Sequence, residues 1–102
     1  SNYVAGTGTI NAEGKVGPIG GAKYKIIAAG DKGVAVFLVP KENCSDVNEM
    51  RKSNPELLKY RDSNGQRQQM QIVAVENLDQ AVQSLERIRD KGIHTDGLPT
   101  CG

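Results

Sequence analysis

Apolar residues along the chain fall into runs whose spacing predicts alternating strands and helices. Two short runs near the N-terminus, 3–10 and 15–19, flank a polar segment that ends at Gly14, and a glycine there suits a hairpin turn. We therefore expect two strands joined as a β-hairpin. Several glycines leave these strands with few side chains, which allows another backbone to approach closely. They are Gly6, Gly8, Gly17, Gly20 and Gly21.

The middle of the chain predicts a helix, a buried strand and a second helix. Segment 22–30 has helical composition. The run 34–39 is continuously apolar and ends at Pro40, which is typical of a strand buried on both faces of a parallel sheet. Residues of the cap-forming type at 43–45 then begin a helix, and 57–58 add a further helical turn.

The C-terminal part predicts a loop, a strand and a long helix. Segment 62–69 is polar and contains a glycine, so we expect a surface loop there. Segment 70–75 is rich in strand-forming residues. Asn77 and Gln80 resemble a capping box, and the apolar residues that follow repeat at helical spacing until Gly92.

The order of elements is therefore β-β-α-β-α-β-α, which predicts an α/β fold with a mixed sheet that contains parallel pairs. At 102 residues the chain is long enough for one domain only. We expect residues 1–2 to be a cloning remnant, 3–92 to form the domain and 93–102 to be a flexible tail.

Charge and composition exclude several classes of partner. Thirteen Lys and Arg residues against twelve Asp and Glu residues leave a net charge of +1, and aromatic residues are only 4% of the chain. Nucleic-acid binding is therefore disfavoured. The apolar run 34–39 is far shorter than the roughly 20 residues of a membrane span, so we expect no membrane contact by this segment.

Nucleotide and metal motifs are also missing. A phosphate-binding loop needs Gly-Lys-Ser/Thr, whereas Ala22 precedes Lys23 and Tyr24 follows it. Cys44 and Cys101 have no CxxC spacing, and two cysteines are too few for a disulfide scaffold. We therefore expect no metal and no cofactor in this chain, and an unpaired Cys44.

The first predicted helix carries the candidate chemistry. Lys25 shares a helical face with Ala28 and Ala29, so its stem lies over methyl groups. Desolvation favours the neutral form of an amine, and a neutral lysine can act as general base for a serine hydroxyl. The alternative is that Lys23 and Lys25 are both solvated residues on the helix surface.

Three strings of the sequence, in order, resemble the proteolytic domain of the Lon (protease La) family. The resemblance covers 3–43 strongly and 70–90 less specifically, and it does not extend to 53–69 or the tail. It implies the Lon proteolytic fold, which is similar to a ribosomal-protein domain-2-like fold. The strings are VAGTGTI at 4–10, GKVGPIGGAKYK at 14–25 and VFLVPKEN at 36–43.

The resemblance implies roles for two residues. The family's catalytic lysine stands four positions after the second glycine of the Gly-Gly pair, which is Lys25 here, and Lys23 is the non-catalytic neighbour. Thr7 matches the threonine that lies beside the lysine amine. The family's nucleophilic serine lies farther upstream than the 24 residues that precede Lys25, so we expect it to be absent from this chain and the chain to be inactive alone.

By this resemblance the parent is a serine endopeptidase with a serine/lysine dyad, acting on peptides or proteins and assembled as a homo-oligomer. Thr9 stands where many ATP-dependent Lon enzymes have an acidic residue, and Gly-Thr-Gly-Thr looks more like the membrane-anchored bacterial Lon-like proteases with a PDZ domain. ATP use by the parent stays open, as does its location, with the protease domain either extracytoplasmic or cytoplasmic.

Two other functions compete with proteolysis. The first is a non-catalytic interaction or scaffold domain that keeps the Lon proteolytic fold, with the glycine-rich strands as a docking edge. The second is nucleic-acid binding, suggested by the similarity to ribosomal proteins and opposed by the near-zero net charge.

Overall fold

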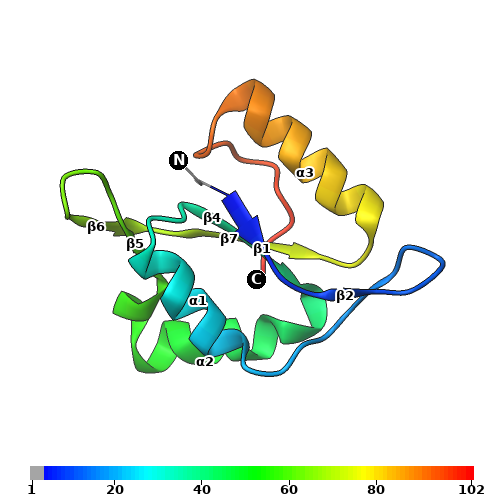
Figure 1. The fold of residues 1–102 in the computed structure, drawn as a ribbon, viewed down its shortest axis with the longest axis horizontal. Coiled ribbons are helices and arrows are strands. Elements are labelled where there is room, and N and C mark those ends of the chain that lie inside the picture. The colour runs from blue at the N-terminus through cyan, green and yellow to red at the C-terminus, as the bar shows by residue number, and fades with distance from the viewer. Residues whose placement is uncertain (1–3) are drawn as a thin grey trace.

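A parallel three-stranded sheet forms the centre of the molecule (Figure 1). The computed structural model describes residues 4–102, so the expectations for Ser1, Asn2 and Tyr3 lie outside the described residues. The strands are β1 (Val4–Gly6), β4 (Val36–Pro40) and β7 (Gln71–Val75), in the order β1-β4-β7. Strands and helices alternate around this sheet, which confirms the predicted α/β class.

Strand β4 lies between the other two strands and is buried along its whole length. Its Phe37 is in register with Ala5 of β1 on one side and with Ile72 of β7 on the other. A strand paired on both edges and covered on both faces has no solvent-facing positions, which is why its sequence is continuously apolar. The prediction of a doubly buried strand is confirmed.

Helices cover both faces of the sheet. Figure 1 shows α1 (Ala22–Asp31) and α2 (Cys44–Ser53) on one face and α3 (Leu78–Lys91) on the other. Short 3₁₀ helices, η1 (Lys41–Asn43) and η2 (Pro55–Leu58), precede and follow α2. The core joins Ile26 of α1, Val47 of α2 and Ile88 of α3 to the sheet. Each helix therefore buries an apolar face against the same strands.

The predicted N-terminal hairpin is only partly correct. Antiparallel pairing is confined to β2 (Thr9–Ile10) and β3 (Val16–Gly17), whereas β1 pairs in parallel with β4. The expected single strand over 3–10 breaks at Gly8, where φ is 152° and an added Cβ would lie 3.2 Å from Val16 Cγ1. The chain changes partner between Gly6 and Thr9, and only a glycine fits at position 8 without displacing Val16 or Pro40.

The predicted loop over 62–69 is instead the turn and second strand of a hairpin. Strands β5 (Lys59–Arg61) and β6 (Arg67–Gln69) pair antiparallel. The Asp62 carboxylate closes the turn by accepting hydrogen bonds from Asn64 N and Gln66 N, each 2.9 Å. The Gln66 backbone N–H and then the Gln68 amide hold the pKa of Asp62 below its usual value. All of β6 is exposed, so it lacks the apolar alternation that signals a strand.

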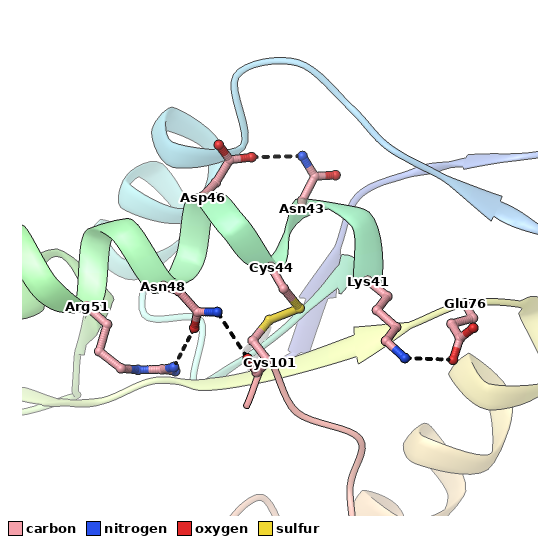
Figure 2. The surroundings of a disulfide bond; sticks show 8 residues. All are labelled: Lys41, Asn43, Cys44, Asp46, Asn48, Arg51, Glu76 and Cys101. Carbon is pink, nitrogen blue, oxygen red and sulfur yellow. Dashed lines mark hydrogen bonds and ion pairs between the residues drawn. A yellow bond between two sulfur atoms is a disulfide. The ribbon is translucent and has the colours of Figure 1, made fainter.

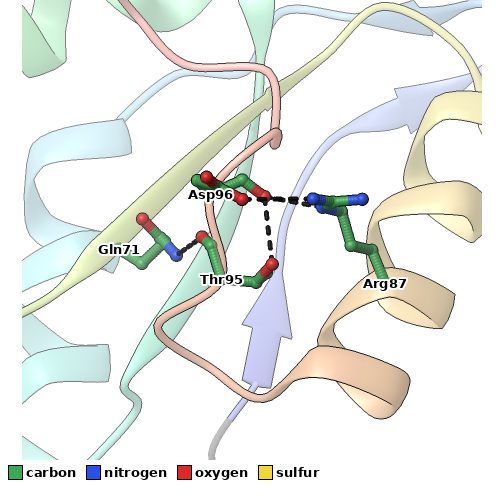
Figure 3. A network of polar contacts seen from close by, with 4 residues as sticks. All are labelled: Gln71, Arg87, Thr95 and Asp96. Carbon is green, nitrogen blue, oxygen red and sulfur yellow. Dashed lines mark hydrogen bonds and ion pairs between the residues drawn. The ribbon is translucent and has the colours of Figure 1, made fainter.

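Residues 93–102 make specific contacts, which differs from the expectation of a flexible tail (Figure 3). Ala74 N on β7 donates to Pro99 O at 2.9 Å, and Gln71 Nε2 donates to Thr95 O at 3.2 Å. Arg87 of α3 pairs with Asp96, its Nη2 lying 3.1 Å from Oδ1. The C-terminal segment therefore lies along β7 and is tied to α3.

A disulfide joins Cys44, the first residue of α2, to Cys101 (Figure 2). Their Cα atoms are 5.1 Å apart, and Asn48 Nδ2 donates to Cys101 O at 3.2 Å. The expectation of an unpaired Cys44 is wrong. The sequence separation of 57 residues carries no local spacing signal, so only the fold brings the two thiols together.

The disulfide predicts a clear loss of stability on reduction. Replacing Cys44 and Cys101 by serine lowers the free energy of unfolding by about 2–4 kcal/mol, because the open chain regains the entropy of a long loop. Denaturant unfolding with and without a dithiol reductant measures this. Reduced wild type and the double variant should then agree, and an oxidised wild type no more stable than the variant contradicts the prediction.

Gly30 allows α1 to approach the β5 backbone closely. It is buried in the last turn of the helix, and an added Cβ would collide with the Lys59 carbonyl oxygen and lie 3.3 Å from Met70 Cε. Backbone cannot move aside as a flexible side chain can. The helix therefore needs a glycine here although glycine lowers helix propensity.

Gly30→Ala tests this close approach. The change would ordinarily add about 1 kcal/mol of helix propensity. We expect instead a net loss of about 1–3 kcal/mol, because the helix must shift away from Lys59. Thermal and denaturant unfolding measure it.

Gly20→Ala is the matched control, since nothing lies within 4 Å of a Cβ there, and it should change stability by less than about 0.5 kcal/mol. A stabilised Gly30→Ala protein would contradict the close packing.

Candidate functional site

A cleft of about 550 Å³ lies between β1 and the exposed side of α1. Thr7 and Lys25 both line it, although they come from different elements. Lys32 lines it too, two helical turns after Lys25. The remaining wall is mostly apolar and includes Val4, Ala5, Ala28, Ala29, Val34 and Phe37. The two residues singled out from the sequence thus share one cavity.

The start of α1 places Lys25 on this cleft. Gly21 precedes the helix with φ 69° and ψ 26°, a left-handed conformation that side chains disfavour. Its carbonyl oxygen accepts a hydrogen bond from Lys25 N at 3.2 Å, so Lys25 is held in the first turn. Lys23 and Lys25 are both exposed, but only Lys25 lines the cleft. Positions two residues apart on a helix point to different sides.

The end of β1 places Thr7. Its N–H donates to Leu38 O at 3.1 Å, which extends the pairing with β4 by one residue. Gly6 lets the two strands lie close, since an added Cβ would be 3.2 Å from Leu38 Cβ. Thr7 is half-buried and leaves the sheet at the carboxyl edge of β1.

The polar side chains that line the cleft carry two amines and one hydroxyl. Its lining contains Thr7, Lys25 and Lys32 but no carboxylate. Within residues 4–102 neither lysine forms an ion pair, and no described serine lines the cleft. Such a lining can supply a base and a hydroxyl group.

Asn43 is the residue whose role the sequence analysis missed. It was expected among the caps of α2, yet its side chain makes no capping hydrogen bond. It is buried and bonds instead to Ile19, in the loop before α1, and to Asp46 (Figure 2). Ile19 is 24 positions away in the sequence, so no local pattern could have indicated the contact.

Two further findings concern the described part of the chain as a whole. From Val4 to Gly102 no three His, Cys, Asp or Glu side chains gather in a way that could hold a metal ion. Over the same residues no helix combines the length and the apolar character needed to cross a bilayer.

Comparison with known proteins agrees with the resemblance in the sequence. The family model of the Lon protease (S16) C-terminal proteolytic domain matches residues 1–86. A Lon protease of Haemophilus influenzae is 42% identical over 79 residues, which cover 78% of this chain and 8% of that protein. A Lon protease of Roseiflexus castenholzii is 40% identical over 80 residues, covering 78% and 8% respectively.

A third relative matches more of the chain. The Lon protease of Chloroflexus aggregans is 33% identical over 98 residues, which cover 95% of this chain and 10% of that protein. The chain thus spans about a tenth of the length of these relatives. The matches identify it as a member of the Lon protease family and as part of the C-terminal proteolytic domain.

Proposed function

We propose that this domain supplies the general base of a serine/lysine dyad that hydrolyses peptide bonds in peptide or protein substrates. Lys25 is the base and Thr7 positions its amine. The observation that supports this is the shared cleft: Thr7 and Lys25 line one cavity, whereas Lys23 does not. Membership of the Lon protease family supports the reaction class.

The reaction proceeds through an acyl-enzyme. The Lys25 amine takes the proton of a serine hydroxyl, and the serine oxygen attacks the carbonyl carbon of the substrate. The resulting ammonium returns the proton to the leaving amine, and water then hydrolyses the ester. Thr7 contributes a hydroxyl that exchanges hydrogen bonds with the amine and keeps it directed at the serine.

The serine is proposed to come from the part of the proteolytic domain upstream of these residues. No described serine lines the cleft, so residues 1–102 alone are expected to be inactive. The whole protease is proposed to be a homo-oligomer that needs no metal or cofactor at this site and makes no contact with nucleic acid or membrane through this domain.

The first test compares two lysines of the same helix in the full-length protease. Lys25→Ala should lower kcat at least about 100-fold, because it removes the group that accepts the serine proton. Lys23→Ala, two residues earlier on the same helix and outside the cleft, should stay within about twofold of wild type. Steady-state peptide hydrolysis measures both. Equal activity of the two variants would remove Lys25 from the mechanism and favour the non-catalytic scaffold.

The second test removes the Thr7 hydroxyl while keeping its shape. Thr7→Val retains the backbone bond to Leu38 O, so the strand pairing stays intact. We expect kcat to fall about tenfold, the cost of roughly one hydrogen bond to the amine. Thr9→Val, on the exposed strand β2, is the control and should keep its activity. A fully active Thr7→Val enzyme speaks against the positioning role.

A further inference from the structure

We infer that Asn43 is a positioning residue for Lys25, acting through the loop from which α1 starts. The inference deepens the proposed function and rests on it, since it takes Lys25 as the base. Asn43 does not line the cleft and touches no reacting atom. Its effect passes through the backbone of residues 19–21.

The Asn43 side chain is a two-point clamp on Ile19. Its Oδ1 accepts from Ile19 N at 3.0 Å, and its Nδ2 donates to Ile19 O at 2.9 Å. The second hydrogen of Nδ2 goes to Asp46 Oδ2 at 3.0 Å. Because the amide is 4% exposed, water cannot replace these bonds without opening the structure. Bonding both backbone groups of one residue fixes its position and its orientation.

The loop after Ile19 depends on this clamp. Gly20 and Gly21 carry no side chains that could pack, and nothing lies within 4 Å of a Cβ at either position. Gly21 O accepts the hydrogen bond from Lys25 N. A displacement of Ile19 therefore passes through two unpacked glycines to the turn that carries the amine.

The same stretch of chain also holds Thr7. Leu38 O of β4 accepts from Thr7 N, and Asn43 follows on the same stretch, as the last residue of η1. Residues 38–43 thus anchor Thr7 at one end and the start of α1 at the other. This stretch sets the distance between the proposed base and its partner, and a misplacement of about 1 Å can cost about 100-fold in rate.

An asparagine is required by the chemistry of the clamp. An aspartate would keep an acceptor for Ile19 N, but it would lose the donor to Ile19 O and place a second carboxylate beside Asp46. Asn43→Asp with Asp46→Asn restores a donor and acceptor between positions 43 and 46. It still leaves Ile19 O without its partner. The double variant therefore separates stability from positioning.

The experiment measures kcat, KM and melting temperature in the full-length protease. Asn43→Asp should lower kcat about 10- to 100-fold with KM within about threefold. The double variant should recover most of the melting temperature and keep the low kcat. Amide exchange in peptides that cover 18–24 should be faster in both. The control is Asn48→Asp, because Asn48 lies five residues farther along, on α2, and bonds to Cys101 O instead of Ile19; it should keep wild-type kcat.

Two outcomes would overturn the inference. Recovery of kcat together with melting temperature in the double variant would make Asn43 purely structural. Wild-type kcat in Asn43→Asp would also show that Asn43 does not position Lys25. If the single variant does not fold, the kcat of the double variant decides between the two roles. Lys25→Ala is measured in parallel: activity retained there overturns the proposed function and the inference with it, whereas loss there with an active Asn43→Asp overturns the inference alone.

Discussion

The burial of β4 is the constraint on which the rest of the structure depends. Every residue from Val36 to Pro40 is buried, and both edges of the strand are paired. A strand in this position must have β1 and β7 in register beside it and helices over both faces, because otherwise its backbone and side chains would meet water without partners. The segments that connect β1 to β4 and β4 to β7, together with the long helix α3, satisfy that requirement.

The candidate site lies outside β4, where the need for complete burial does not restrict the sequence. Parallel strands end at one edge of the sheet, and side chains from several segments can meet there without disturbing the core. Thr7 leaves β1 at that edge, and Asn43 follows β4 in the same region. Lys25 is placed there by α1, which follows β3 in the chain. The glycines at 20 and 21 allow a tight turn but leave the loop less rigid. Long-range hydrogen bonds from Asn43 to Ile19 hold the start of this loop in place.

Sequence patterns predicted the elements that bury one continuous face. The apolar run of β4 and the capped periodicity of α3 were found for that reason, and the Asn77 side chain does accept from Gln80 N at 2.8 Å. Lys25 and Thr7 were singled out from the resemblance, and the fold places both on one cleft. The exposed hairpin at 59–69, the clamp of Asn43 and the Cys44 to Cys101 bond were missed. The hairpin was missed because β6 is fully exposed and has no apolar alternation. The other two depend on contacts between residues 24 and 57 positions apart, which no local period encodes.

The disulfide also divides the molecule into two covalent regions. Residues 44–101 form a closed ring of chain, whereas Thr7, Lys25 and Asn43 lie outside it. A single backbone cut inside the ring, for example in the exposed turn at 63–66, would leave both pieces linked through sulfur. While the bond is intact, nicking of this half of the domain does not release a fragment, and the sheet can keep β7 in place after the cut.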